Sequence, residues 1–165
     1  MTADEHDRPA TGTIFEDIEA FFASLPEGLR LIGIDAGTKT LGLALSDVNR
    51  SIASPLETIR KTKFTTDAAR LLALCNEHRV AGLVLGLPIN LDGSEGPRAQ
   101  STRAMARNLN RLSPLPILLW DERLTTAEAE RMLIAADQSR KRRAEVIDKL
   151  AATIILQNAL DRMRN

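Results

Sequence analysis

Residues 29–46 read Leu-Arg-Leu-Ile-Gly-Ile-Asp-Ala-Gly-Thr-Lys-Thr-Leu-Gly-Leu-Ala-Leu-Ser, and this stretch decides the fold class. Two strand-like runs rich in apolar residues, 29–35 and 40–46, are separated by residues 36–39. So short a connection can turn the chain back beside itself, but it cannot form the crossover that parallel strands require. The stretch therefore predicts an antiparallel β-hairpin.

The remainder of the chain adds further strands and the helices that would cover them. Residues 52–59 predict a third extended segment that completes an antiparallel meander, and the apolar runs at 80–87 and 116–120 indicate buried strands. This order predicts a mixed α/β sheet covered by helices, with the later strands parallel. The predicted helices span residues 65–79, 97–112, 125–135 and 142–162.

Two of these helices begin with residues suited to capping. Thr65-Thr66-Asp67 offers side-chain oxygens to the first backbone N–H groups of the helix at 65–79. Thr125, with Glu128 three residues later, forms a capping box for the helix at 125–135. Both patterns strengthen the assignment of these segments as helices.

The N-terminal segment has a different character from the rest of the chain. Residues 1–12 show no pattern of regular structure, whereas apolar residues recur at helical spacing over 14–25 and end at Pro26-Glu27-Gly28. This helix either docks on the domain surface or binds a partner. We therefore divide the chain into an N-terminal extension, residues 1–28, and one domain, residues 29–165.

The composition is that of an ordinary globular protein. Among 165 residues, 44% are hydrophobic and 27% charged, and 22 basic residues balance 22 acidic ones, so any basic surface must be local. No apolar run approaches the ~18 residues of a membrane span, and Met1–Pro9 lacks the layout of a signal peptide. The single cysteine, Cys75, is expected to be buried and inert. We expect a cytoplasmic protein without membrane contact.

Three acidic residues have settings that suit a metal ligand. Asp35 and Glu122 close predicted strands, and Asp148 borders the apolar stripe of the last helix. A carboxylate in such a place is costly to desolvate, and three that converge repel one another unless a divalent cation compensates them. The combination indicates metal-dependent phosphoryl chemistry.

Each of these acids also has a plainer interpretation. Asp35 could cap a turn, and Asp47, at the end of the second strand, is a rival ligand that itself resembles a turn residue. Asp121 and Glu122 could both be solvated, and adjacent strand positions point to opposite faces, so only one can serve the site. Asp148 could pair with a nearby basic side chain, Lys149 or Arg142.

Basic residues form two groups. Arg103, Arg107 and Arg111 share one helix face, with Arg98 near its start, and form either a solvated face or a phosphate-contacting stripe. Arg140-Lys141-Arg142-Arg143 is expected in a loop beside the site. Residues 91–97 form a flexible loop leading into a helix N-terminus, a candidate anion site. With one Trp, four Phe and no Tyr, an aromatic stacking platform is not expected, so recognition should rest on backbone shape and charge.

Other catalytic schemes lack their residues. The only histidines, His6 and His78, cannot complete a serine triad, a cysteine dyad or a zinc site, and no Walker loop or dinucleotide fingerprint is present. Residues 35–38, Asp-Ala-Gly-Thr, superficially match the phosphate loop of actin-like ATPases and sugar kinases. That fold requires two such lobes, and the chain has one.

Four segments together resemble the YqgF family, the RNase-H-fold proteins described as Holliday-junction-resolvase-like or as nucleases of pre-16S ribosomal RNA. The matching segments occur in family order between about residues 30 and 161. They are residues 33–47, residues 84–93 with Gly86-Leu87-Pro88 and Asp92-Gly93, residues 121–129 with Asp121-Glu122-Arg123, and residues 148–157 with Asp148-Lys149-Leu150.

The resemblance implies a fold, an activity and a site. The implied fold is RNase H-like, a five-stranded mixed sheet of three antiparallel and then two parallel strands flanked by helices. The implied activity is hydrolysis of phosphodiester bonds in 5′-end maturation of pre-16S ribosomal RNA. By the same resemblance, the acidic site falls on Asp35, Glu122 and Asp148. The N-terminal 28 residues lie outside the resemblance.

We hypothesise a two-metal mechanism with Mg²⁺ or Mn²⁺, in which Asp35 bridges both ions and Glu122 and Asp148 each complete one. Two alternatives stay open: a DNA endonuclease that resolves Holliday junctions, and a non-catalytic RNA-binding assembly factor. We expect nucleic acid, either precursor ribosomal RNA or branched DNA, as the partner of a monomer or weak homodimer. The candidate nucleic-acid contacts are Lys39, Arg103, Arg107, Arg123, Arg142 and Arg143.

Overall fold

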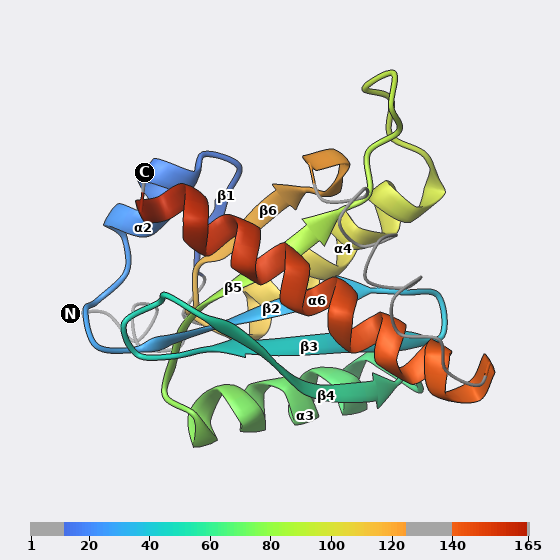
Figure 1. The fold of residues 1–165 in the computed structure, drawn as a ribbon, viewed down its shortest axis with the longest axis horizontal. Coiled ribbons are helices and arrows are strands. Elements are labelled where there is room, and N and C mark those ends of the chain that lie inside the picture. Colours follow the sequence, from blue (N-terminus) through green and yellow to red (C-terminus); the bar gives the residue numbers. More distant parts are fainter. Residues whose placement is uncertain (1–11, 125–139, 165) are drawn as a thin grey trace, which may run out of the picture.

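A computed structural model describes residues 12–124 and 140–164, with side chains placed for 12–123 and 149–164 (Figure 1). Its strands form one sheet in the order β1-β6-β5-β2-β3-β4. The strands β2, β3 and β4, which form one end of this order, pair antiparallel, whereas β5, β6 and β1 extend the sheet from β2 in parallel. The strands are β1 (Ile14–Phe15), β2 (Arg30–Ala36), β3 (Thr40–Ser46), β4 (Ala53–Arg60), β5 (Val80–Leu87) and β6 (Ile117–Asp121).

The mixed α/β architecture and the antiparallel hairpin are confirmed, but the prediction of five strands was wrong because the sheet has six. The additional strand, β1, is only two residues long and pairs Ile14 with Ile117 of β6. The apolar spacing over 14–25 predicted one helix, whereas α2 spans only Ile18–Ala23. Asp17 caps α2 by accepting hydrogen bonds from the backbone N–H groups of Glu19 and Ala20, which sets the start of the helix.

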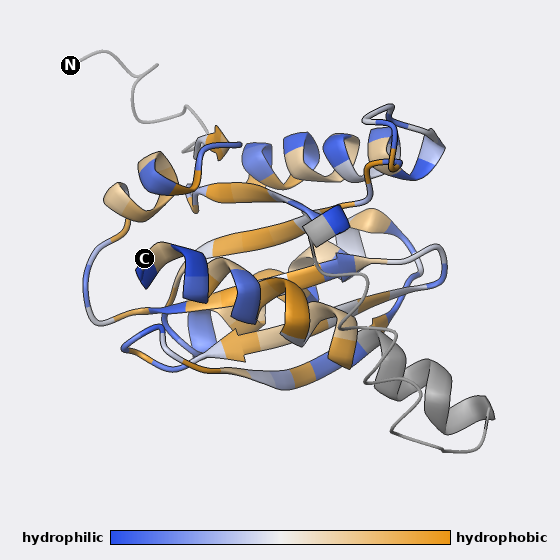
Figure 2. Cartoon of the chain, turned by 45° about the horizontal axis from the view of Figure 1, so that its top comes forward, coloured by the Kyte–Doolittle hydropathy of each residue, from blue (hydrophilic) through white to orange (hydrophobic). Residues whose placement is uncertain are grey.

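Helices cover both faces of the sheet (Figure 1). On one face lie α3 (Phe64–Glu77) and α4 (Pro97–Leu112), and on the other lie α6 (Arg140–Arg164) and α2. Figure 2 shows that the strands are largely hydrophobic and that α4 is hydrophilic on the side turned away from the sheet. Of the described helices, none has the length and apolar character needed to cross a membrane.

Alternate residues of the strands pack into two separate hydrophobic cores, one on each face of the sheet. Ile32, Ile34 and Leu85 pack toward α3 and α4, whereas Leu31 and Val84 pack toward α6 and α2. Within the second core, Phe21 of α2 is fully buried and its ring meets that of Phe15 edge to face at 5.8 Å between centroids. The helix α2 therefore docks on the domain, the first of its two interpretations. The boundary of the N-terminal extension at residue 28 stays a prediction.

Helix starts differ from the predictions in two places. The helix α3 begins at Phe64, so Asp67 lies inside its first turn and not at the capping position before it. The carboxylate of Asp67 accepts hydrogen bonds from the backbone N–H and the hydroxyl of Thr62. The helix α6 begins at Arg140, so the loop predicted for residues 140–143 was wrong. Arginine and lysine are good helix formers, and no glycine or proline separates them from the apolar stripe. The predicted helix at 125–135 and its capping box lie outside the described residues.

Candidate active site

Strand alternation places Asp35 on the α6 face of the sheet. Gly33, two residues earlier in β2, lies so close to α6 that a Cβ there would stand 2.9 Å from the carbonyl oxygen of Ala152 and 2.7 Å from Cβ of Leu156. Asp35 shares that face because successive side chains alternate. Leu118 and Trp120 of β6 pack in the same core, so Glu122, two residues further on, continues their side of the sheet.

The glycine of β5, Gly86, allows the two acids to meet. The strand β5 lies between β2 and β6, with Ile34 opposite Leu85 and Trp120 opposite Gly86. A Cβ at Gly86 would stand 3.0 Å from Oε1 of Glu122 and 2.5 Å from Cδ1 of Ile155. The carboxyl group of Glu122 therefore lies over the bare backbone of β5, and it shares a hydrogen bond with Asp35 on the far side of that strand.

This arrangement changes the acidity of Glu122. Burial raises the pKa of its carboxyl group to about 7, and the negative charge of Asp35 adds to the increase. The positive charge of Arg98 acts in the opposite direction and lowers that pKa. Glu122 therefore holds its proton at mildly acidic pH, where an exposed glutamate would be ionised.

The third predicted acid, Asp148, lies in α6, but its side chain is outside the described residues. Its backbone is one turn before Ala152, the residue that touches β2 at Gly33. The helix α6 thus approaches the first strand of the hairpin closely at Ala152. Hydrogen bonds from Arg70 lower the pKa of Glu57 in β4, and the charge of Lys149, one proposed partner of Asp148, adds to that decrease.

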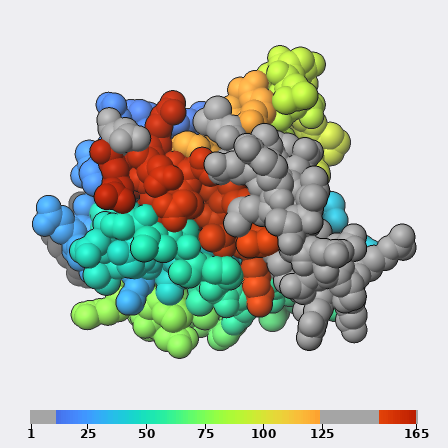
Figure 3. All heavy atoms as spheres, viewed as in Figure 1, coloured from blue at the N-terminus to red at the C-terminus, as the bar shows by residue number. Residues whose placement is uncertain are grey.

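A cavity of about 420 Å³ opens beside Glu122. Its walls come from the loop after β5, from the start of α4 and from α6, and they include Asn90, Leu91, Arg98, Arg123, Ala151 and Ile155. Figure 3 shows residues near 122, in orange, beside the yellow-green loop that follows β5. The cavity therefore gives an extended ligand access to the acidic pair.

Arg98 is the residue of this site that sequence analysis named only in passing. Its guanidinium reaches across to the carbonyl oxygen of Ala36, the last residue of β2, at 3.5 Å. It also lines the cavity, and its positive charge lowers the pKa of Glu122. The residue is predictable only once the start of α4 is known to lie beside the end of β2, and no local pattern conveys that neighbourhood.

The structure distributes the predicted basic residues unevenly. Arg123 binds Asp121 through three side-chain contacts of 2.7 to 3.1 Å, and Arg103 donates to Glu95 and Glu16, so both charges are matched locally. Lys39, in the turn after β2, and Arg107, on α4, are exposed. Arg142 and Arg143 lie in the first turn of α6, with side chains outside the described residues.

Two other acids of the region have local roles. Asp47, the rival ligand, accepts backbone hydrogen bonds from Ser51 and Ile52 and is a turn residue at the far end of the hairpin. Asp121 accepts hydrogen bonds from Arg123, and these lower the pKa of the Asp121 carboxyl group. The plainer interpretation of Asp47 is therefore confirmed, and of the pair 121 and 122 only Glu122 faces Asp35.

The acidic pair suits a divalent cation. Two carboxyl groups that share a hydrogen bond present oxygen ligands of the kind that Mg²⁺ and Mn²⁺ prefer, and their mutual repulsion is what a cation would relieve. Among the side chains placed in the structure, no group of three candidate metal ligands forms. Asp148 is not among those side chains.

Comparison with known proteins places the chain among nucleases. Residues 29–162 match the RuvX family, described as Holliday junction resolvase. A protein of Cereibacter sphaeroides named "Putative pre-16S rRNA nuclease" is 65% identical over 91% of this chain and 94% of its own length. One of the same name from Paracoccus denitrificans is 62% identical over 92% of this chain and 96% of its own.

Among solved structures, the RuvC protein of T. thermophilus in complex with a Holliday junction substrate resembles this chain with a TM-score of 0.52. The superposition covers 83% of this chain and 97% of RuvC, at 15% sequence identity. At that identity the similarity establishes the RNase H-like fold and nothing finer. It agrees with the mixed sheet described above.

Proposed function

The chain belongs to the RuvX family, and on that premise we propose that it is a metal-dependent nuclease that hydrolyses phosphodiester bonds of precursor 16S ribosomal RNA. The observation that carries the proposal is the pairing of Asp35 with Glu122 over Gly86, at the carboxyl end of the central parallel strands. Ligands of α/β sheets bind at that edge. The names of the relatives that are more than 60% identical supply the choice of substrate.

Asp35, Glu122 and Asp148 would hold two Mg²⁺ or Mn²⁺ ions, with Asp35 shared between them. When bound, such ions activate the attacking water and stabilise the charge on the leaving oxygen. Glu122 must give up its proton to become a ligand, and Arg98 favours that ionised form. The requirement predicts that metal binding releases a proton below pH 7.

The basic side chains around this edge would hold the phosphates of the substrate. Arg98 and Lys39 lie at the end of β2, and Arg107 is exposed further along α4. Arg123, Arg142 and Arg143 remain candidates, and Arg103 contributes least because two carboxylates already match its charge. Such contacts position the backbone without reading sequence. We further propose that the protein acts in the cytoplasm as a monomer or weak homodimer.

The proposal is tested by incubating the purified protein with two labelled substrates, precursor 16S ribosomal RNA and a four-way DNA junction, in Mg²⁺ or Mn²⁺. We expect cleavage of the RNA and its loss in Asp35→Asn, which keeps the shape of the side chain but removes its charge. Glu77→Gln, at the exposed end of α3, is the matched control and should cleave like the wild type.

The other outcomes point to other functions. Cleavage of the junction alone would assign the chain to DNA junction resolution, the activity for which its family is named. No cleavage of either substrate by folded protein with metal present would favour a binding factor that retains the acidic residues without using them. Cleavage that persists in Asp35→Asn would refute the assignment of the site.

A further inference from the structure

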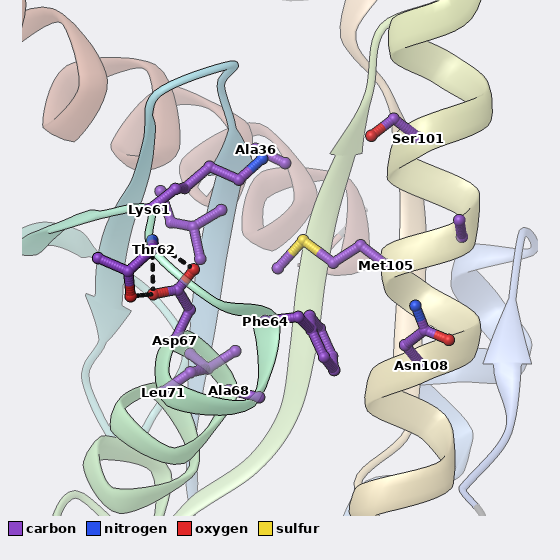
Figure 4. A pocket seen from close by; sticks show the side chains of 12 residues that line it. Ala36, Lys61, Thr62, Phe64, Asp67, Ala68, Leu71, Ser101, Met105 and Asn108 are labelled. Carbon is purple, nitrogen blue, oxygen red and sulfur yellow. Dashed lines mark hydrogen bonds between the residues drawn. The ribbon is translucent and has the colours of Figure 1, made fainter.

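A second cavity lies on the face of the sheet opposite to the acids. It has a volume of about 310 Å³ and lies between the start of α3 and the middle of α4, closed below by the ends of β2 and β3 (Figure 4). That volume is at the small end of the range for small-molecule sites. One of its lining residues is Ala36, the neighbour of Asp35 in sequence.

The walls of this cavity combine an apolar slot with polar groups on both sides, Thr62 and Asp67 beside the start of α3 and Ser101 and Asn108 on α4. Phe64, at the start of α3, and Met105, on α4, extend into the space between the two helices (Figure 4). Leu41, Leu71, Ala68 and Ala104 complete the apolar lining. Such a slot suits a flat aromatic ligand, because one aromatic ring and a thioether offer stacking and dispersion contacts.

The carboxylate on the α3 side of the cavity is fixed in place. Asp67 is only 6% exposed, and its carboxylate accepts hydrogen bonds from the backbone N–H and the hydroxyl of Thr62 at 3.1 to 3.2 Å. Those three bonds leave lone pairs of the carboxylate for a further donor. Asn108 and Ser101 line the same space from α4. These groups can hydrogen-bond the edge of a ligand that carries N–H groups.

A cation lines the cavity next to the turn after β2. Lys61 lines the cavity, and its ammonium group donates to the carbonyl oxygen of Gly37 in the turn after β2. Arg98 contacts the adjacent carbonyl of Ala36. The end of β2 therefore carries positive charge between the acids on one face and the cavity on the other.

From this juxtaposition we infer that the cavity between α3 and α4 binds a nucleobase of the substrate strand, at a nucleotide close to the scissile phosphate. The inference rests on the proposed function for the presence of that strand. A base would stack on Phe64, hydrogen-bond to Asp67 on the α3 side or to Asn108 on the α4 side, and leave its phosphate at Lys61. This inference differs from the sequence-based expectation that recognition rests on backbone shape and charge alone. Phe64 would stack on one base inside a cavity and would not form part of a platform of several aromatic side chains.

The test uses full-length, ¹⁵N-labelled protein without metal, titrated with each of the four nucleoside 5′-monophosphates and, separately, with inorganic phosphate. We expect nucleotides to shift the amide resonances of Thr62, Asp67 and Asn108, and phosphate alone to leave them unchanged. Ala104→Leu fills the slot and should weaken nucleotide binding at least tenfold. Gln100→Leu adds the same side chain at an exposed position of α4 outside the cavity and should not.

Phe64→Leu provides a second variant should Ala104→Leu not fold. It keeps the apolar volume, loses the aromatic face, and should weaken binding about tenfold. The inference is overturned if no nucleotide shifts these resonances, if phosphate shifts them equally, or if Ala104→Leu binds like the wild type. Because binding is measured without metal or cleavage, a protein that binds nucleotides here but cleaves nothing would refute the proposed function and leave the cavity assignment standing.

Discussion

Replacing Glu122 by glutamine should stabilise the metal-free protein at alkaline pH, because the acidic pair costs folding free energy. Burial and Asp35 raise the pKa of Glu122 to about 7 from the ordinary value of 4.5. Between these two pH values the folded state holds a proton that the unfolded state has lost, so the stability of the wild type falls as the pH rises through this window. Above pH 7 the full penalty is present.

The size of the effect follows from the shift. A difference of about 2.5 pH units corresponds to about 3 kcal/mol. Because the carboxyl group borders a cavity that admits solvent, we expect about 1 to 3 kcal/mol to be realised. Glutamine keeps the shape and can donate a hydrogen bond to Asp35, but it cannot ionise, so Glu122→Gln should escape the penalty.

The assay is urea unfolding in EDTA at pH 4.5 and pH 8, followed by the fluorescence of Trp120, the single tryptophan, which is 8% exposed. The quantity compared is the free energy of unfolding of Glu122→Gln minus that of the wild type, in which the contributions of groups that titrate alike in both proteins cancel. That difference should be larger at pH 8 by about 1 to 3 kcal/mol. Glu77→Gln should show no such change, and Mg²⁺ at pH 8 should restore stability to the wild type more than to Glu122→Gln. An unfolding difference that is the same at both pH values would refute the reasoning.

Two further predictions concern the neighbours of this pair. Gly86→Ala brings a Cβ within 3.0 Å of Oε1 of Glu122 and 2.5 Å of Cδ1 of Ile155, so it should displace the carboxyl group and lower kcat more than tenfold. Adding Ile155→Val removes the clash with Cδ1 of Ile155 and leaves the one with Glu122. Circular dichroism and kcat of this double variant would show whether activity is lost through disturbed packing or through displacement of the carboxyl group. Recovered activity would contradict the role given to Gly86. Phe21→Ala should cost about 3 to 5 kcal/mol in urea unfolding because Phe21 is fully buried, whereas Phe22→Ala, at a position 43% exposed, should cost far less. Equal losses would show that α2 does not depend on its buried face.

The sequence predicted the strands well where their signal is local. The apolar run Val80–Leu87 and the helix Pro97–Leu112 have the predicted bounds, because a continuous apolar segment and a proline in the first turn leave few alternatives. Cys75 is buried as expected, and burial raises its pKa to about 12. The two-residue strand β1 was missed because its strand conformation depends on pairing with β6. No periodicity within Ile14–Phe15 can express a tertiary contact.

The acids were predictable individually, but their meeting was not. Asp35 is the next-to-last residue of β2 and Glu122 directly follows β6, and a position near a strand end alone made them candidates. Their contact depends on the order β6-β5-β2, which places one strand between them, and on the absence of a side chain at Gly86. Arg98 and the second cavity depend on the same order, because α4 must return beside the end of β2. Spacing along the chain does not encode these neighbours.

The end of β2 lies between the acidic site and the cavity that we assign to a base. Asp35 faces α6 and the acidic site, whereas Ala36, the next residue, lines the cavity between α3 and α4, because adjacent strand positions point to opposite faces. A nucleic-acid strand that passes this end of the sheet can therefore present a phosphate to one face and a base to the other. The acids alone would cleave wherever a phosphate reaches them. A base held beyond Ala36 would fix which phosphate does so, and the position of cleavage would then depend on Phe64 and Ala104 rather than on the acidic residues.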